Sequence, residues 1–242
     1  MSIKVSDRLT PVTPLQFLQG LAQSWVNLFT LPATKEQLLV LMAQSALETG
    51  RWRYIHTYNF GNSKSTDGDG RDYCYFACWE VFSNAVAAAY VAASKPGAEA
   101  RITETHSDGT STVWFYPEHP ACRFRAFQVL NADGTIDEWS SLVLGMTDYL
   151  GMLRKRFNQC WSAVLSGDPV NFVKALKAQG YFTAPLQGYI DNEVALFKEF
   201  GHLNVDYNAL PVIPDDKRKL ITDFSAVVAQ EYLADIQELE QT

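Results

Sequence analysis

Residues 44–50, Gln-Ser-Ala-Leu-Glu-Thr-Gly, close a predicted helix that carries one carboxylate on an otherwise apolar face. Thr34 and Gln37 have the spacing of a capping box, so the helix should begin at Thr34, and the final glycine is a suitable stop. Glu48 follows Leu41 by seven residues, so it should continue the buried face. A carboxyl group buried without a partner is costly or stays protonated, which makes Glu48 the first candidate for chemistry.

The surroundings of Glu48 in the sequence support two interpretations. Trp52 and Tyr58 follow closely, and an apolar, aromatic setting raises the pKa of a carboxyl group, as a general acid near neutral pH requires. Alternatively, Glu48 is an ordinary helix-end residue that pairs with Arg51 or Arg53.

Five short stretches of the sequence occur in the order of a known family. They are 44–50, 58–62 (Tyr-Asn-Phe-Gly-Asn), 102–109 (Ile-Thr-Glu-Thr-His-Ser-Asp-Gly), 124–127 (Phe-Arg-Ala-Phe) and 180–184 (Gly-Tyr-Phe-Thr-Ala). Together they resemble the lysozyme-like peptidoglycan hydrolases, especially the glucosaminidase family of autolysins and flagellar-rod hydrolases. The resemblance spans residues 15–200, and Ala184 departs from it where the family has Asp.

The resemblance implies a lysozyme-like two-lobed fold with a small β-hairpin lobe and a groove for the glycan strands of peptidoglycan. It implies that Glu48 is the general acid that cleaves a β-1,4 glycosidic bond between N-acetylated amino sugars. Glu104 is the nearest match to a second carboxylate, although an ungapped alignment from Asp108 puts Thr105 at that position. A shift of one residue reverses the strand face, so both alternatives stay open.

The same resemblance assigns substrate-binding residues. Asn59 would hold the sugar N-acetyl group or the catalytic Glu, since an amide both donates and accepts hydrogen bonds. Tyr58 and Phe60 flank it, and Tyr181 would line the sugar site. No metal and no cofactor is expected. The bond cleaved, of the N-acetylglucosaminidase or the muramidase type, stays open, as does the anhydro-forming route of lytic transglycosylases.

The rest of the chain predicts further helices and one small β-structure. A β-hairpin is expected over residues 101–116 and a third strand over 122–127. Helical spacing or helix-forming composition marks residues 14–29, 34–50, 79–93, 141–161, 168–180, 185–200 and the chain after 216. The predicted fold class is therefore α+β, mostly α. We expect a catalytic domain over residues 1–202, with an insertion at about 65–97, and a C-terminal linker and helical extension over 203–242.

Composition and charge exclude several classes of protein. The 242 residues are 47% hydrophobic and 19% charged, values that are typical of a globular protein. The net charge of −7 argues against nucleic acid and against anionic membranes as partners. No apolar run reaches the roughly 20 residues of a membrane span, and the N-terminus lacks the apolar segment of a signal peptide.

The missing signal peptide predicts synthesis in the cytoplasm. The resemblance to peptidoglycan hydrolases implies that the chain acts on the bacterial cell wall, in the periplasm, after phage-type or secretion-system delivery. The two settings considered are a phage endolysin and an antimicrobial toxin. The expected partners are peptidoglycan glycan strands, together with an immunity protein or a component of the virion or delivery system.

Two rivals to a hydrolase remain. One is a non-catalytic murein-binding or structural module on the same fold, because a fold does not determine a function. The other is a zinc-stabilised interaction domain, because Cys74, Cys78, Cys122 and His119 could supply a Cys3His set. Free thiols are the more common state of such cysteines, and a single disulfide among them stays open.

Overall fold

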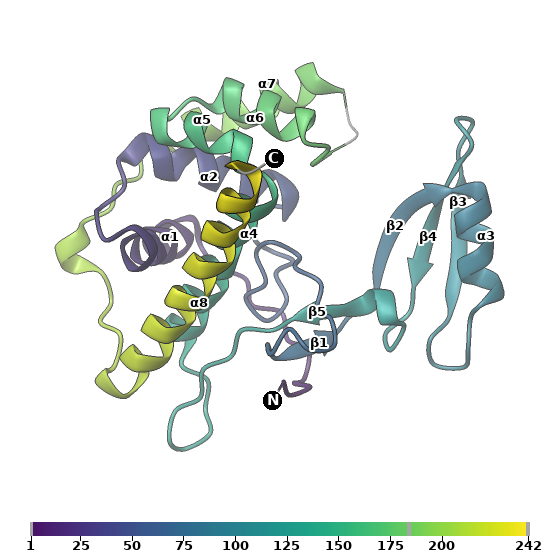
Figure 1. The fold of residues 1–242 in the computed structure, drawn as a ribbon, viewed down its shortest axis with the longest axis horizontal. Helices are drawn as coiled ribbons and strands as arrows, with labels where there is room; N and C mark the ends of the chain where they lie inside the picture. The colour runs from purple at the N-terminus through teal and green to yellow at the C-terminus, as the bar shows by residue number, and fades with distance from the viewer. Residues whose placement is uncertain (1, 183–184, 241–242) are drawn as a thin grey trace. The chain divides into compact units, whose positions relative to one another are not determined.

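A computed structural model describes the backbone of residues 2–182 and 185–240, and their side chains up to residue 233. The chain forms two compact units, whose helices and strands are labelled in Figure 1. Unit 1 combines the chain up to Arg8 with Asn62–Ala126, and unit 2 combines Leu9–Gly61 with the chain from Phe127 onward. Both units are therefore discontinuous in sequence.

Unit 2 is helical. Its helices are α1 (Pro14–Phe29), α2 (Lys35–Glu48), α4 (Glu138–Arg156), α5 (Trp161–Ser166), α6 (Pro169–Ala178), α7 (Leu186–Phe200) and α8 (Asp215–Glu240). The short 3-10 helix η2 (Asn158–Cys160) joins α4 to α5, and η3 (Tyr207–Ala209) lies between α7 and α8.

Capping boxes begin both α1 and α2. The side chain of Thr34 accepts a hydrogen bond from the N–H of Gln37, and Gln37 Oε1 accepts one from the N–H of Thr34 at 2.9 Å. Thr13 and Gln16 form the same reciprocal pair for α1. These bonds satisfy N–H groups that the first helical turn leaves without partners, and they confirm the predicted starts of both helices.

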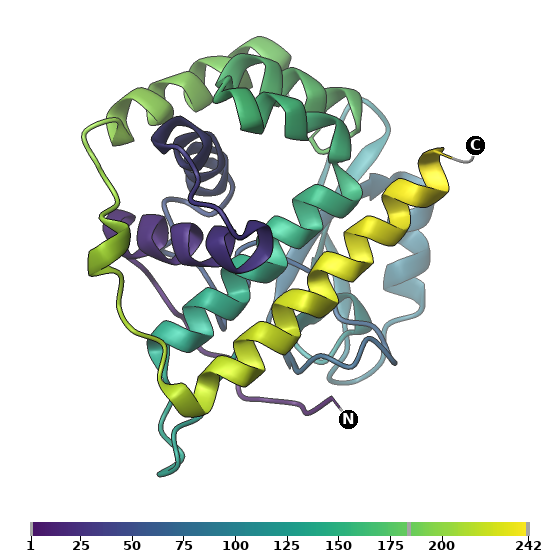
Figure 2. The same ribbon diagram turned by 60° about the vertical axis from the view of Figure 1, so that its left-hand side comes forward.

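The core of unit 2 lies between helices that are distant in sequence. α4 packs against α1 and α8, and α7 packs against α2 and α6; Figure 2 shows α4 and α8 side by side. Phe17 stacks on the fully buried Trp52 with ring centroids 4.5 Å apart. Burial of large apolar side chains contributes roughly 1.5–3 kcal/mol each, so this packing holds the segment after α2 in place.

Gly145 allows the chain at Tyr58 to approach α4 closely. A Cβ atom at position 145 would lie 2.0 Å from the carbonyl oxygen of Tyr58. No side chain fits at that distance from a backbone atom, so the approach requires glycine.

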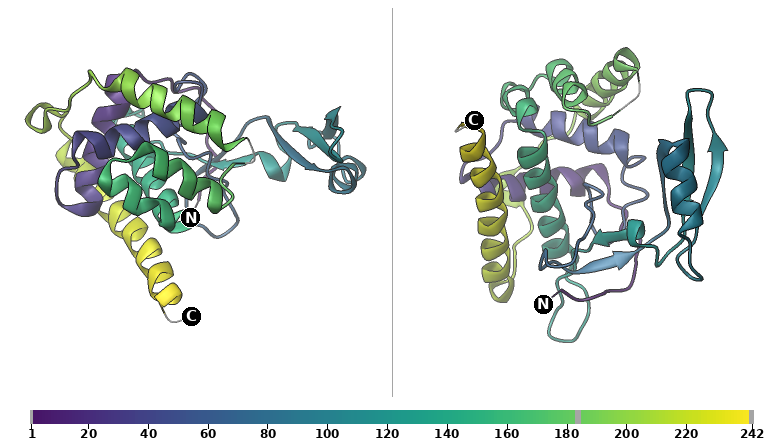
Figure 3. Two further views of the ribbon diagram at one scale, coloured as in Figure 1. Left: turned by 90° about the horizontal axis from the view of Figure 1, so that it is seen from above. Right: turned by 45° about the vertical axis from the view of Figure 1, so that its right-hand side comes forward.

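Unit 1 contains two small antiparallel sheets. β2 (Cys78–Ser83), β4 (Thr110–Phe115) and β3 (Ala100–Thr105) form one in the order β2-β4-β3, and β1 (Tyr73–Tyr75) pairs with β5 (Arg123–Arg125) in the other. The short 3-10 helix η1 (Pro120–Cys122) precedes β5. Figure 3 shows α3 (Asn84–Ala92) lying along the three-stranded sheet, where Ala87 packs in one core with Val113 and Phe115.

The opposite face of this sheet carries a pair of tryptophans. Trp79 on β2 and Trp114 on β4 are direct cross-strand partners, and they alternate with the residues that face α3. Trp79 is 61% exposed. Its partner Trp114 is half-buried, so the pair presents part of two indole rings to solvent.

Two predicted helices are partly wrong. Residues 79–93 divide into β2 and α3, because the Trp-Glu-Val-Phe run pairs with β4 and this pairing overrides the helical tendency of the alanines that follow. Residues 141–161 divide into α4, η2 and α5. α4 begins earlier than predicted because Asp137 caps it by accepting from the N–H of Ser140. The sequence analysis does not predict β1, the strand that pairs with β5.

The other predicted helices and the hairpin are confirmed, and so is the fold class, α+β and mostly α. None of the helices in the described part of the chain combines the length and apolarity that crossing a bilayer requires.

We expect Gly145→Ala to lower the free energy of unfolding by about 3 kcal/mol, because the added methyl group must displace the backbone at Tyr58. Urea unfolding measures the change. Gly188→Ala in α7 is the matched control: its Cβ would meet nothing within 4 Å, so it should be neutral or stabilising by up to about 1 kcal/mol. Equal stabilities for the two variants would contradict the close approach.

Candidate functional site

Glu48 is the last residue of α2, and the hydroxyl of Tyr189 on α7 donates a hydrogen bond to its Oε1. As a whole residue Glu48 is exposed, because the helix ends there, whereas the helical spacing predicts a buried position. The atoms around its carboxyl group nevertheless desolvate it in part. Burial raises the pKa of this group, and the hydrogen bond from Tyr189 acts in the opposite direction. Glu48 thus combines access from solvent with a raised pKa.

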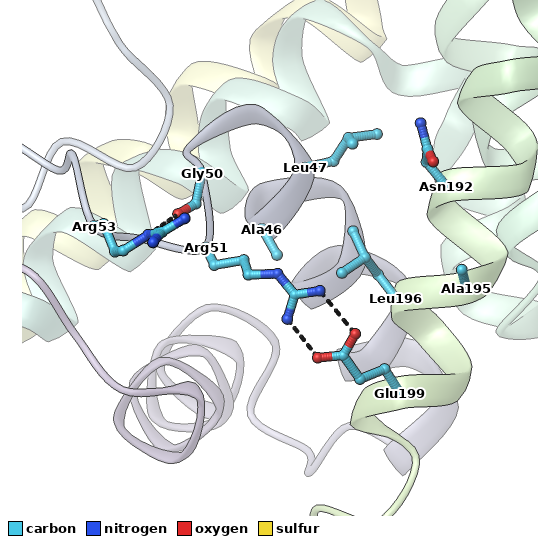
Figure 4. Close-up of a pocket in the computed structure, with 9 residues that line it drawn as sticks. All are labelled: Ala46, Leu47, Gly50, Arg51, Arg53, Asn192, Ala195, Leu196 and Glu199. Carbon is cyan, nitrogen blue, oxygen red and sulfur yellow. Dashed lines mark hydrogen bonds and ion pairs between the residues drawn. The ribbon is translucent and has the colours of Figure 1, made fainter.

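The arginines near Glu48 have other partners. Arg51 forms a two-bonded ion pair with Glu199 on α7, in which Nη2 donates to Oε2 at 2.8 Å (Figure 4). Arg53 donates from Nε to the carbonyl oxygen of Gly50 at 3.2 Å. These bonds disfavour the interpretation in which Glu48 is a helix-end residue neutralised by an arginine.

A pocket of about 360 Å³ lies between the end of α2 and α7, and Figure 4 shows the Arg51–Glu199 ion pair within its wall. Its lining residues are Ala46, Leu47, Gly50, Arg51, Arg53, Asn192, Ala195, Leu196 and Glu199. The pocket is therefore built by α2, the segment that follows it and α7, and its lining does not include Glu48 or Tyr189.

Gln44 connects two further tyrosines to this region, one turn before Glu48. Its Nε2 donates to the hydroxyl oxygen of Tyr181 at 2.6 Å, and its Oε1 accepts from the hydroxyl of Tyr149 on α4. Burial raises the pKa of Tyr181, and the negative charge of Glu48 raises it further. The sequence analysis names Glu48 and Tyr181 as site residues in two distant motifs. The structure brings these two residues into one region.

Glu193 on α7 supplies a second carboxyl group. Its side chain is fully buried, and neither of its oxygens has a hydrogen-bond partner within the described residues. Burial raises its pKa far above the usual value, and the charge of Glu48 adds to this. Burial therefore favours the neutral, protonated form of Glu193 over its charged form. We refer to Gln44, Glu48, Tyr149, Tyr181, Tyr189 and Glu193 as the α2–α7 cluster.

Four members of this cluster, Gln44, Tyr149, Tyr189 and Glu193, are absent from the sequence-based prediction. For Glu193 a signal exists. It lies three residues after Ile190 and three before Leu196, so it interrupts an apolar helical face in the way that identifies Glu48. The tyrosines carry no such signal, because a tyrosine on a buried helix face is ordinary.

The predicted substrate-binding residues 58–60 lie in unit 2 and are buried. Asn59 is 1% exposed. The hydroxyl of Tyr58 donates to Glu138, and Phe60 packs edge-to-face against Phe17. Their contacts with a sugar stay predictions. Ala184, where the sequence departs from the family motif, lies outside the described residues.

Glu104 lies on β3 in unit 1. It is exposed, it faces Thr112 across the strand pair, and its Oε1 is 3.7 Å from Nδ1 of His106. A bulge between Ile102 and Glu104 shifts the register of β3 against β4. Because Glu104 and Glu48 belong to different units, a shared catalytic role for them stays a prediction. The alternative alignment, in which Thr105 occupies the position of the second carboxylate, also stays open.

Metal ligands do not gather in the described part of the chain, where no group of three or more His, Cys, Asp or Glu side chains could hold an ion. Within the Cys3His set considered from the sequence, Cys78 and Cys122 lie together, with their Sγ atoms 3.6 Å apart. All four cysteines are free thiols.

The chemistry that the α2–α7 cluster supports is proton donation. A carboxyl group with a raised pKa, such as that of Glu48, stays protonated closer to neutral pH than the carboxyl group of an ordinary glutamate. Tyr189 holds one of its oxygens and so limits how it can turn. Such a group is suited to donate a proton to a substrate atom brought to the end of α2.

No protein-family model and no curated protein matches the sequence. Among solved structures, the chain is similar to a C-terminally truncated glycoside hydrolase domain from Salmonella typhimurium FlgJ, with 16% sequence identity and a TM-score of 0.40. The match covers 79% of this chain and 99% of that domain.

We expect Glu193 to make the free energy of unfolding depend on pH. Its pKa is raised on folding, so the stability that its neutral form contributes is complete below the unfolded-state pKa of about 4.3 and is lost as the pH rises toward the folded-state pKa. The free energy of unfolding should fall by up to about 1.4 kcal/mol per pH unit above pH ~5. We expect Glu193→Gln to remove most of this slope, as measured by urea unfolding between pH ~5 and ~8.

Glu199→Gln on the same helix is the matched control. Glu199 is exposed, and its hydrogen bond with Arg51 lowers its pKa, so it titrates below this pH range. The control should keep the slope of the wild-type protein. An unchanged slope in Glu193→Gln would mean that position 193 does not take up a proton on folding.

Proposed function

We propose that the protein is a glycoside hydrolase that cleaves a β-1,4 bond in the glycan strands of peptidoglycan, with Glu48 as general acid. The observation that carries this proposal is that Glu48 is an exposed residue whose carboxyl pKa is raised by burial and whose Oε1 accepts a hydrogen bond from Tyr189. The choice of peptidoglycan as substrate rests on the ordered sequence motifs that surround Glu48.

In the proposed reaction, Glu48 is protonated when the substrate binds. It donates its proton to the glycosidic oxygen as the bond to the anomeric carbon breaks, and it becomes a carboxylate. The hydrogen bond from Tyr189 then stabilises this charged form, which is why it lowers the pKa of the free residue. Glu193 is fully buried, so we propose no contact between it and the sugar.

The second half of the reaction needs a group that stabilises or captures the positively charged sugar. We propose Glu104 for this role. Two routes do without a second carboxylate: the N-acetyl group of the substrate assists, or its 6-hydroxyl attacks to give an anhydro product. Tyr181, Asn59, Tyr58 and Phe60 are the proposed substrate-binding residues, and Tyr181 is the one that shares the α2–α7 cluster with Glu48.

A second candidate function is a non-catalytic murein-binding module. The cross-strand pair of the exposed Trp79 and the half-buried Trp114 favours it, because aromatic rings at a surface offer flat apolar areas on which sugar rings can pack. Such a module would bind insoluble peptidoglycan without producing new reducing ends. The predicted delivery route, and the predicted immunity or virion partner, stay predictions.

We expect Glu48→Gln to lower the rate of peptidoglycan cleavage by about 10²–10⁴-fold, because the amide cannot donate the required proton. Mass spectrometry of the soluble products measures the rate and also distinguishes hydrated from anhydro ends. Glu36→Gln is the matched control, since Glu36 is an exposed carboxylate on the same helix. Cleavage by Glu48→Gln at the wild-type rate would reject the assignment, and binding without cleavage by the wild-type protein would favour the module.

We expect Tyr189→Phe to move the alkaline limb of the pH–rate profile to higher pH. Removal of the hydroxyl removes a bond that stabilises the charged carboxylate, so the pKa of Glu48 rises and its acid form persists to higher pH. The profile of kcat/KM against pH measures the shift. Tyr54→Phe is the control, because Tyr54 is 69% exposed. A limb that moves to lower pH would contradict the role given to Tyr189.

A further inference from the structure

Cys78 and Cys122 face each other inside unit 1. Cys78 opens β2, Cys122 ends η1, and their Sγ atoms are 3.6 Å apart. A disulfide joins two sulfur atoms at about 2.05 Å, so movement of the side chains by roughly 1.5 Å would bring these two within bonding distance. Cys122 is fully buried and Cys78 is partly exposed, so Cys78 is the thiol that a reagent in solution meets.

Lys64 lies beside the exposed member of the pair. Its Nζ is 3.7 Å from Sγ of Cys78 and donates to the carbonyl oxygen of Ala121 at 2.6 Å, which fixes the position of the ammonium group. Glu80 also lies close, with Oε1 3.0 Å from the same Nζ. The positive charge beside Cys78 favours its thiolate form, which is the nucleophile in disulfide chemistry.

The two thiols therefore differ in reactivity. The hydrogen bond with Cys122 lowers the pKa of Cys78, and the charge of Lys64 adds to this, against the opposing effects of burial and Glu80. The same hydrogen bond raises the pKa of Cys122, and so does burial. Cys78 is thus suited to attack first, and Cys122 is placed to attack second.

We propose that Cys78 and Cys122 form a thiol oxidation site that takes a small-molecule disulfide, such as oxidised glutathione, and closes an intramolecular disulfide bond. This inference does not depend on the function proposed for Glu48, which lies in the other unit.

The reaction proceeds by two exchanges. The thiolate of Cys78 attacks one sulfur of oxidised glutathione, the S–S bond breaks, and one glutathione leaves as a thiolate. Cys122 gives its proton to that thiolate and attacks the Cys78 sulfur, which releases the second glutathione. The second glutathione takes up the proton that Cys78 had lost. Two cysteine thiols are oxidised by two electrons, and one oxidised glutathione is reduced to two thiols.

The new bond would close a loop over residues 78–122, which contains β2, α3, β3 and β4. Closure of a long loop stabilises a fold mainly by restricting the unfolded chain. Oxidation should therefore raise the melting temperature of unit 1. It would also fix the start of β2 to the segment that leads into β5.

The test equilibrates the intact protein in glutathione buffers of increasing oxidised fraction, then alkylates the remaining thiols in denaturant and counts them by mass. The wild-type chain has 4 cysteines and should lose two thiols, with the peptides of Cys78 and Cys122 joined. Cys122→Ser should stop at a glutathione adduct on Cys78. Cys78→Ser should keep its remaining thiols under the same conditions.

Cys74→Ser and Cys160→Ser are the matched controls, because each removes another buried thiol. Both should still form the Cys78–Cys122 bond. Lys64→Gln should slow the first exchange by roughly threefold to tenfold, because the thiolate loses its neighbouring charge. The proposal is overturned if the folded wild-type protein keeps all its thiols where the unfolded chain is oxidised, or if the bond that forms includes Cys74 or Cys160.

Discussion

The packing of α7 against α2 is the contact on which the candidate site depends. α2 supplies Gln44 and Glu48, and α7 supplies Tyr189 and Glu193, so neither helix builds the cluster alone. The contact removes water from the Glu48 carboxyl group and at the same time places a hydroxyl donor on it. These two effects oppose each other, and the effect of burial is the larger. Glu48 at the end of an isolated helix would be an ordinary exposed glutamate.

The parts of the fold that local signals control could be predicted from the sequence. α1 and α2 begin at capping boxes, α6 begins where Asp168 caps a helix that starts with proline, and the β3–β4 hairpin turns at Gly109. Each of these signals acts within about one helical turn or one tight turn, so tertiary contacts do not change the outcome. Glu48 could be predicted for a similar reason, because an acidic residue that interrupts an apolar helical spacing is visible in one segment.

The parts that depend on distant partners could not be predicted. β2 stands directly before an alanine-rich helix, and its pairing with β4 is what makes it a strand. Tyr189 is 141 residues from Glu48, and no local pattern shows that the two meet. Helical spacing could identify Glu193 as buried but not as a neighbour of Glu48. Likewise, four cysteines in a sequence do not reveal which two lie in contact.

Because unit 2 is discontinuous, α1 and α2 meet α4 and α7 only after a long intervening segment has been synthesised. α1 and α2 leave the ribosome first, whereas α4 and α7, which cover them, come after the whole 62–126 segment. Contacts between such distant segments form slowly, so the apolar faces of α1 and α2 stay exposed to solvent until α4 and α7 pack on them. The three-stranded sheet is built from nearby segments and can assemble earlier. The surroundings of Glu48 are therefore completed late. A nascent chain that stops short of α7 contains the acidic residue but not the environment that changes its chemistry.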